Sequence, residues 1–307
     1  MGHVQRYVVR GGVTKLLLHR CQRHRRCQRK HRKCAMFWFA RKPGRHATGE
    51  LPIPPLEMRK LVGSYEEQTF NNPSGVRVFA GVDGSSDEFI FDFGCGCGRV
   101  ARQLLQQHDP PRRYVGVDLH KGMVQWCRRN LQPRHAGFEF HHQDVFNAGL
   151  NPRGKLKHSR FPVSDKTVSL LVAVSVFTHV LEESAVFYLR EMARVLGSNG
   201  KAATTWFLFD KSSFPMMQDF QNALFINPCD LTNAVIFDRS WLAAQASSAG
   251  LRICSATPPS IRGFHWSIHF EPAVAGAGHV AFADDAAPVG TAPPPLLPRR
   301  AHKIDSD

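Results

Sequence analysis

The stretch EFIFDFGCGCGRVARQLLQQ, residues 88–107, decides the fold. It opens with an apolar run around Asp92, continues with glycine at every second position (Gly94, Gly96 and Gly98), and ends with apolar and charged residues at helical spacing. A tight turn from a strand into a helix needs residues without Cβ, because these reach positive φ and let the backbone approach a ligand closely. The stretch therefore predicts a strand, a ligand-binding turn and a helix.

Similar runs recur along the chain. Apolar runs rich in β-branched and aromatic residues predict strands, and segments with helical spacing lie between them. The predicted strands are 88–93, 113–118, 138–144, 168–175 and 202–210, and the predicted helices are 99–108, 121–131 and 184–196. Parallel neighbours need crossover connections, which are nearly always right-handed. The alternation therefore predicts an α/β protein with a doubly wound, mostly parallel sheet.

Three acids follow the first three predicted strands. Asp92 precedes the glycine turn, while Asp118 and Asp144 end the next two runs. Ligands of open α/β sheets bind beyond the carboxyl ends of the strands, so these acids would surround one nucleotide-like ligand. A dinucleotide site prefers G-x-G-x-x-G and would be disturbed by an acid beside its phosphates. The observed D-x-G-x-G-x-G suits a ligand with an ammonium group and no phosphate.

These residues carry a family resemblance. FDFGCGCGRVARQL, YVGVDLHKGMV, FEFHHQDVFN and VFTHVLEESAVFYLREMARVLGSNGKAATTW occur in this order over residues 89–206. The set resembles the class I S-adenosylmethionine-dependent methyltransferases, which implies S-adenosyl-L-methionine as cofactor. It also implies a seven-stranded sheet with an antiparallel edge strand. The runs at 251–259 and 264–272 fit its last two strands, and 241–250 fits the helix before them.

The resemblance also implies roles for individual residues. Asp118 would accept hydrogen bonds from both ribose hydroxyls, and Asp144 would accept one from the adenine amine. The alternative for either acid is a helix N-cap, where aspartate is common. The full set of cofactor-binding residues implied is Asp92, Gly94, Cys95, Gly96, Gly98, Asp118, Leu119, Met123, Asp144, Val145, Ser175, Val176 and Phe177.

Catalytic residues are less constrained, because methyl transfer depends largely on holding the two reactants together. His179, just beyond the fourth strand, is the first candidate for a general base, since imidazole exchanges protons near neutral pH. Its alternative is a histidine at a helix start, bonded to backbone. Asp210, at the end of the fifth strand, is the second candidate. No metal-ligand constellation accompanies them.

Residues 209–241 interrupt the alternation, and insertions at this place in the resembled fold commonly cover the acceptor. The apolar residues Phe214, Met216, Met217 and Phe220 would then form a wall of the acceptor site. The alternative is that they only pack the inserted segment onto the sheet. This segment therefore belongs to the predicted methyltransferase domain, residues 88–272.

Composition sets the remaining limits. The net charge of +15 is uneven: residues 1–50 carry 14 Lys and Arg against one acid, and residues 51–307 carry 26 against 24. We predict a basic disordered extension at 1–49, a cap segment at 50–87 and a disordered Ala/Pro-rich tail at 273–307. For residues 1–49, a nucleic-acid arm, a metal site and upstream sequence from a wrong start remain alternatives. The scattered cysteines and the absence of an export signal or a membrane-length apolar run predict a cytoplasmic protein.

The sequence narrows the class of methyl acceptor but does not identify the molecule. VSVFTH stands where enzymes that methylate adenine or glutamine nitrogens carry N/D-P-P-[FYW]. The near-neutral core favours a small-molecule acceptor over nucleic acid, because RNA binding needs a basic face on the folded domain. We therefore predict methyl transfer to oxygen, nitrogen or carbon of a small molecule. An RNA methyltransferase using the basic arm and an inactive partner protein are the alternatives.

Overall fold

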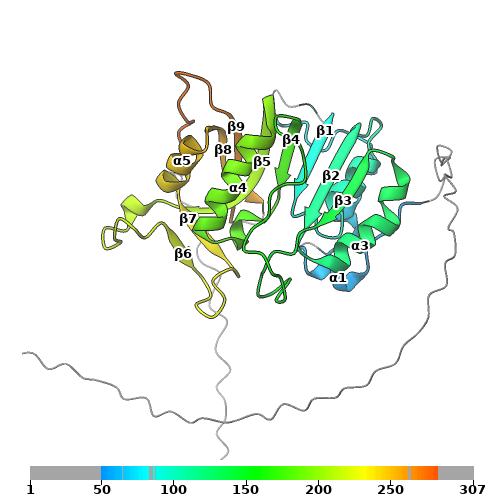
Figure 1. Ribbon diagram of the computed structural model, residues 1–307, viewed down its shortest axis with the longest axis horizontal. Helices are drawn as coiled ribbons and strands as arrows, with labels where there is room; N and C mark the ends of the chain where they lie inside the picture. The colour runs from blue at the N-terminus through cyan, green and yellow to red at the C-terminus, as the bar shows by residue number, and fades with distance from the viewer. Residues whose placement is uncertain (1–49, 64, 83–85, 87, 262–263, 283–307) are drawn as a thin grey trace, which may run out of the picture. The chain divides into compact units, whose positions relative to one another are not determined.

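The computed structural model describes residues 50–282, apart from 64, 83–85, 87 and 262–263 (Figure 1). The predicted basic extension, 1–49, and the end of the predicted tail, 283–307, lie outside the described residues. The helices are α1 Leu56–Lys60, α2 Arg99–Leu105, α3 Lys121–Asn130, α4 Glu182–Val195 and α5 Arg239–Ser248, with the 3-10 turns Glu67–Phe70, Gln132–Arg134, Phe177–His179 and Lys211–Ser213. The strands are β1 Phe89–Phe93, β2 Arg113–Asp118, β3 Phe138–His142, β4 Val168–Ala173, β5 Leu196–Phe209, β6 Ala223–Phe225, β7 Val235–Asp238, β8 Leu251–Ile261 and β9 His265–Pro272.

The sheet confirms the predicted fold class. Strands β3, β2, β1, β4 and β5 lie side by side and run parallel (Figure 1). Strand β9 pairs antiparallel with both β5 and β8, so it is the antiparallel strand and β8 closes that end. These strands form the expected seven-stranded unit.

The inserted segment adds two strands that were not predicted. The end of β5 pairs in parallel with β7, and β7 pairs antiparallel with β6. The sheet of the described residues therefore has nine strands. Strand β5 is long enough to serve both neighbours because it contacts β9 through Ala202–Trp206 and β7 through Phe207–Phe209.

Alternation of side chains along β1 divides the core between the two faces of the sheet. Phe91 and Phe93 pack with residues of α4 and α5 on one face. Ile90 points to the other face, where it packs with residues of α2 and α3. Helices therefore cover both faces, as the pattern predicts for a doubly wound sheet, and buried strands of this kind appear in sequence as continuous apolar runs.

Buried Arg102 on α2 holds the cap segment against the domain. Its guanidinium donates hydrogen bonds to the carbonyl oxygens of Leu51 at 2.8 Å, Pro52 at 3.1 Å and Phe70 at 2.9 Å, and a further one to the Asn71 side chain. Burial lowers the pKa of Arg102, and the nearby acids Glu50 and Glu67 oppose this shift. The planar fork of arginine lets one side chain serve all these acceptors.

Replacing this arginine with lysine should destabilise the domain. We expect Arg102→Lys to lower the free energy of unfolding by about 2 kcal/mol, because an ammonium group cannot reach the separated carbonyl oxygens and leaves some unpaired. Urea unfolding measures the change. Arg112→Lys is the matched control, because Arg112 is exposed in its ion pair with Glu88, and its effect should stay within about 0.5 kcal/mol. Equal effects of the two substitutions would contradict the idea that Arg102 holds the cap segment against the domain.

The ends of several elements differ from prediction. Strand β3 ends at His142 and β4 at Ala173, so Gln143, Asp144 and Ser175 lie in loops. Residues 273–282, assigned to a disordered tail, instead contact the domain: Phe282 packs edge-on against Trp266, and Val280 donates a backbone hydrogen bond to Ile253.

No helix among the described residues is long and apolar enough to cross a lipid bilayer.

Candidate active site

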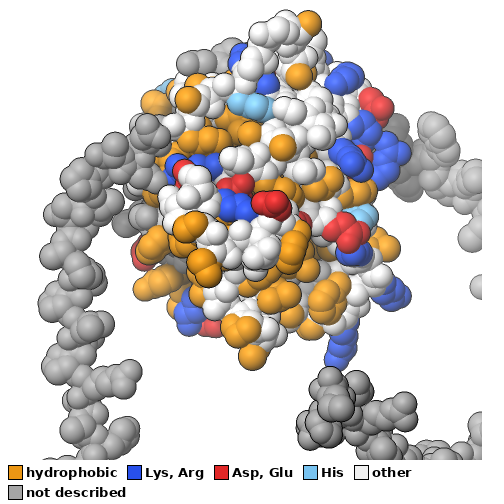
Figure 2. Space-filling view, turned by 90° about the vertical axis from the view of Figure 1, so that its left-hand side faces the viewer, with side chains coloured by type: hydrophobic (Ala, Val, Ile, Leu, Met, Phe, Trp, Pro, Cys, Tyr) orange, Lys and Arg blue, Asp and Glu red, His pale blue; other side chains and the backbone are white. Residues whose placement is uncertain are grey.

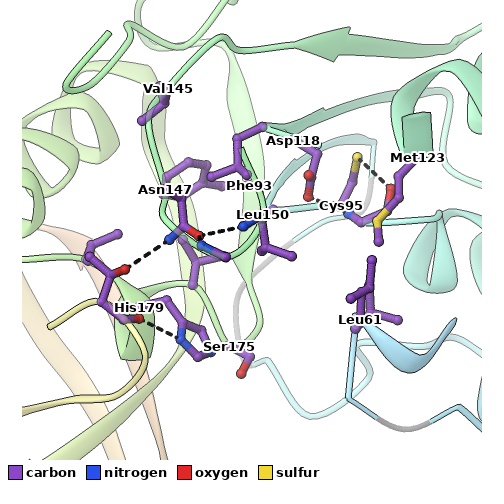
Figure 3. A pocket seen from close by; sticks show the side chains of 18 of the residues that line it. Leu61, Phe93, Cys95, Asp118, Met123, Val145, Asn147, Leu150, Ser175 and His179 are labelled. Atoms are coloured by element: carbon purple, nitrogen blue, oxygen red, sulfur yellow. Dashed lines mark hydrogen bonds between the residues drawn. The ribbon is translucent and has the colours of Figure 1, made fainter. Parts of the chain in front are cut away.

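A cavity of about 740 Å³ lies at the carboxyl ends of the central strands (Figure 3). Its lining comes from the glycine turn after β1, from the loops after β2, β3 and β4, from the segment after α1, and from the inserted segment before β7. Parallel strands bring their carboxyl ends to one edge, which is why loops distant in sequence meet here. The sequence predicted a ligand pocket at this same edge of the sheet.

The glycine turn forms one wall. Gly94, Gly96 and Gly98 all have positive φ, at 82°, 54° and 82°. A Cβ atom on Gly94 would lie 2.3 Å from Cγ2 of Val176, and one on Gly96 would lie 2.6 Å from Cγ1 of Val62. The turn is therefore packed against two side chains that themselves line the cavity, and glycine is required there, as the sequence predicted. Gly98 lies outside the lining and begins α2.

Asp118 is fixed by the turn that it faces. Its two carboxylate oxygens accept hydrogen bonds from the backbone N–H of Gly96 at 2.8 Å and of His120 at 2.7 Å. Burial raises the pKa of Asp118, and these two N–H donors oppose the shift. The N-cap of α3 is His120, whose side chain accepts from Met123, so Asp118 is not the helix cap.

Asp92 lies deeper in the same wall. It is only 2% exposed, and the hydroxyl of Tyr114 donates to its carboxylate at 2.6 Å. Burial raises the pKa of Asp92 to about 7, opposed by the Tyr114 hydrogen bond and reinforced by the charge of Asp118. The acid therefore titrates near neutral pH. Next to it, burial raises the pKa of the Cys95 thiol well above its usual value, so this cavity residue stays protonated.

His179 lines the opposite part of the cavity (Figure 3). It ends the short turn Phe177–His179, and its ring Nδ1 lies 3.1 Å from the carbonyl oxygen of Thr232 in the inserted segment. A carbonyl only accepts, so Nδ1 carries the proton in this contact, and in the neutral ring Nε2 then has the lone pair. His179 is bonded to backbone, as the alternative expected, and it also faces the cavity, so its role as a general base stays a prediction.

The loop before His179 has a strained residue. Ser175, which lines the cavity, has φ at 60°, unusual for a residue with a side chain. Its backbone N–H donates to the Thr205 hydroxyl at 2.7 Å, and its own hydroxyl lies 3.2 Å from Nε2 of His265. Such strain persists only where surrounding contacts hold it and is frequent at functional sites.

The other candidates divide into two groups. Leu119, Met123, Val145 and Val176 line the cavity. Asp144, Phe177 and Asp210 lie outside the lining. The Asp144 carboxylate accepts from Asn151 at 3.3 Å, and its neighbours Gln143 and Val145 line the cavity instead. Phe177 is fully buried and stacks on Trp206.

Asp210 serves a local structural purpose. It caps the turn Lys211–Ser213, accepting from the backbone and hydroxyl of Ser212 at 2.9 and 2.7 Å. These hydrogen bonds lower the pKa of Asp210. The carboxylate therefore stays charged. Asp210 also lies outside the cavity lining, which does not support its predicted role as a base.

Comparison with known proteins agrees with this geometry. Residues 90–200 match the family model described as "Methyltransferase domain". The chain contains a class I methyltransferase domain. The matched residues run from β1 into β5 and include the glycine turn, Asp118 and His179.

Solved structures of methyltransferases are similar in fold. An O-methyltransferase of neocarzinostatin biosynthesis, crystallised with S-adenosylmethionine and 2-hydroxy-5-methyl naphthoic acid, is 15% identical with a TM-score of 0.43, and the match covers 63% of this chain and 51% of that one. Mitomycin 7-O-methyltransferase is 14% identical with a TM-score of 0.45, covering 70% of this chain and 56% of that one. An S-adenosylmethionine-dependent methyltransferase of Leishmania major is 13% identical with a TM-score of 0.48, covering 70% and 77%. This chain thus spans about half the length of the first of these structures.

Sequence patterns missed much of the lining of the methyltransferase domain. The missed residues include Lys60–Gly63 at the end of α1, Phe146, Asn147, Gly149 and Leu150 after β3, Leu181, Ser184 and Tyr188 from the N-cap and first half of α4, and Asp230, Thr232 and Asn233 in the inserted segment. The sequence identified the last segment only as a cover. Among the described residues, no group of three or more His, Cys, Asp or Glu is arranged to hold a metal ion.

The apolar wall expected from the inserted segment is not part of the cavity. Phe214, Met216 and Phe220 are 46%, 88% and 77% exposed, Met217 is half-buried, and all four lie outside the lining. Figure 2 shows hydrophobic side chains on the face that this segment helps to form. Neither expectation, an acceptor wall or packing onto the sheet, describes Met216 and Phe220, because their side chains extend into solvent.

Proposed function

We propose that this chain transfers a methyl group from S-adenosylmethionine to a hydroxyl group of a small-molecule acceptor. One observation carries the proposal: a single cavity contains the glycine turn with Asp118 in one part, and His179 with the inserted segment in another. Cofactor and acceptor would therefore share one enclosure. Methyl transfer requires this, because the attacking atom and the methyl group must be held in line.

The residues present fit the cofactor. Gly94 and Gly96 line the cavity, and a Cβ atom on either would clash with Val176 or Val62, so the turn can adopt this packed, positive-φ conformation only with glycine. Asp118 would accept from the ribose hydroxyls, and Asp92, when ionised, favours the ammonium group. When bound, the cofactor supplies an electrophilic methyl group on a sulfonium. The predicted hydrogen bond from the adenine amine to Asp144 has no support from the cavity, because Asp144 lies outside its lining.

His179 favours a hydroxyl acceptor. A hydroxyl oxygen loses its proton when it is methylated, so the reaction gains from a base within reach. The contact of Nδ1 with the Thr232 carbonyl leaves Nε2 as the atom that accepts a proton. An uncharged amine with a lone pair needs no such base for the attack itself.

The charge of the chain supports a small acceptor rather than RNA. Residues 51–307 carry 26 Lys and Arg against 24 acids, whereas RNA binding draws on a basic face of the folded domain. An inactive partner protein would not need Asp92, Asp118 and the glycines together in one cavity. Methylation of a small molecule is therefore the function best supported.

A labelling experiment tests the proposal. The full chain is incubated with methyl-labelled S-adenosylmethionine and three sets of acceptors: hydroxylated aromatic compounds, primary amines and total RNA. We expect label in at least one hydroxylated compound, recovered as a methyl ether. Label in RNA alone, lost when residues 1–49 are deleted, would overturn the small-molecule proposal in favour of the RNA enzyme.

His179→Gln should slow the reaction on any such acceptor. We expect kcat to fall about 100-fold, because a general base contributes at least this factor, while affinity for S-adenosylhomocysteine changes less than about twofold. Steady-state label transfer measures the first and calorimetry the second. Asp210→Asn is the matched control for the other predicted base, and its kcat should stay within about threefold of the original. A larger loss for Asp210→Asn than for His179→Gln would reverse the assignment.

A further inference from the structure

The inserted segment reaches the cavity through one turn, Asp230–Asn233. Its centre is Thr232, which is half-buried and lines the cavity with Asp230 and Asn233. The backbone N–H and the hydroxyl of Thr232 both donate to Oδ1 of Asp230, at 3.1 and 2.7 Å. Because the hydroxyl proton is committed to the carboxylate, Oγ1 of Thr232 remains an acceptor.

That acceptor is used by the loop after β3. Asn147, which is 9% exposed, donates through Nδ2 to Oγ1 of Thr232 at 3.3 Å (Figure 3). The amide oxygen of Asn147 accepts from the backbone N–H of Gly149 at 3.1 Å and of Leu150 at 2.9 Å. The orientation of the Asn147 amide is therefore fixed by its own loop, and its NH₂ points to the inserted segment.

The remaining contact of Thr232 is with the proposed base. Its carbonyl oxygen lies 3.1 Å from Nδ1 of His179. One residue of the inserted segment thus joins the loop after β3 to the loop after β4, through its side chain to Asn147 and through its carbonyl to His179. The side-chain contacts of Thr232 hold the turn, and with it the carbonyl, in place, together with a backbone hydrogen bond from Asn233 N–H to the Asp230 carbonyl at 3.0 Å.

We propose that Thr232 is a positioning residue that keeps His179 in the tautomer with its proton on Nδ1 and its lone pair on Nε2. The inference rests on the proposed function for its purpose, since that lone pair is the one that would take the acceptor proton. Asn147 and Asp230 act through Thr232, by fixing its hydroxyl. The inserted segment then contributes to proton transfer as well as covering the acceptor.

The tautomer is measured directly, without an acceptor. Long-range ¹H–¹⁵N spectra of the full chain labelled with ¹⁵N-histidine, at a pH above the titration of imidazole, distinguish the two neutral tautomers, and His179→Gln assigns the signal. We expect the original chain to show His179 protonated on Nδ1. Thr232→Val, which keeps the shape and loses the hydroxyl, should lose this single tautomer, and Thr232→Ser, which restores the hydroxyl, should recover it.

A second variant and a binding measurement guard against misfolding. Asn147→Asp keeps the oxygen that accepts from Gly149 and Leu150 but loses the NH₂ donor, so it should shift the tautomer as Thr232→Val does. Unchanged affinity of each variant for S-adenosylhomocysteine shows that the cofactor part is intact. An Nδ1 tautomer that persists in both variants, or its absence from the original chain, overturns the inference.

The outcome is distinguishable from failure of the proposed function. The tautomer measurement tests whether Thr232 positions the imidazole, whereas label transfer by His179→Gln tests whether His179 is the base. If Thr232→Val loses the tautomer while His179→Gln transfers label at the original rate, Thr232 still positions the ring and the catalytic role of His179 is wrong. If His179→Gln loses transfer while Thr232→Val keeps the tautomer, His179 is the base and Thr232 does not position it.

Discussion

Asp118→Ala should weaken binding of S-adenosylhomocysteine by about 10²- to 10⁴-fold. The carboxylate is already held by the backbone N–H groups of Gly96 and His120, so its remaining lone pairs have a fixed direction. A hydrogen bond to a charged group contributes about 1.5–3 kcal/mol, and the ribose offers two hydroxyl donors, which together correspond to this range of dissociation constants. Titration calorimetry on the purified chain measures the change.

The loss has a second physical source. Alanine leaves both N–H groups without the acceptor that now orders the turn, so the glycine wall loses part of its preorganisation. Asp219→Ala is the matched control, because Asp219 is an exposed acid outside the cavity lining. Its affinity should stay within about twofold of the original. Equal binding by the Asp118→Ala variant, with thermal unfolding showing a folded domain, would place the ribose elsewhere.

Part of this site followed from local sequence and part did not. Asp92 and Asp118 were predictable because Asp118 is the last residue of a buried parallel strand and Asp92 the last but one, and such a strand appears in sequence as an apolar run with an acid at its end. The glycine turn was predictable because positive φ and close backbone approach select glycine. These features are local, so a pattern of a few residues carries them. The antiparallel strands at one end of the sheet followed from the family resemblance that the same motifs support.

The missed features depend on contacts distant in sequence. Thr232 meets His179 across 53 residues, and no periodicity in the polar run around it marks that contact. Strand β7, Val235–Asp238, is too short to distinguish from a loop, and it exists because the end of β5 extends beyond β9 and offers an unpaired edge. Asp210 shows the converse error: an acid at a strand end is as suited to capping a following turn as to catalysis.

The buried acid Asp92 should make the unbound domain less stable as the pH rises from about 4 to 7. In the unfolded chain this carboxyl ionises near its ordinary pKa of about 3.9, whereas in the folded domain burial raises its pKa to about 7. Between these values the folded state holds a proton that the unfolded state has released. The free energy of unfolding therefore falls with rising pH through this window and levels off above about 7. A shift of about 3 units corresponds to about 4 kcal/mol.

Asp92→Asn isolates this contribution. Asparagine keeps an oxygen that accepts from the Tyr114 hydroxyl and cannot ionise, so the variant should be about as stable as the original chain near pH 4 and more stable by about 4 kcal/mol near pH 8. Urea unfolding across this range gives the difference, in which titration of the other groups cancels. Parallel pH profiles for the two proteins would contradict the raised pKa.

The same ionisation should couple stability to the cofactor. An ammonium group beside Asp92 favours the carboxylate, so binding of S-adenosylhomocysteine should tighten as the pH rises through about 7 in the original chain and lose this part of its pH dependence in Asp92→Asn. A saturating concentration of this ligand should likewise reduce the fall in the free energy of unfolding with rising pH, because ionisation of Asp92 costs less free energy in the bound state. We therefore propose that the Asp92 carboxylate, which destabilises the unbound domain, is retained because its charge binds the ammonium group of the ligand.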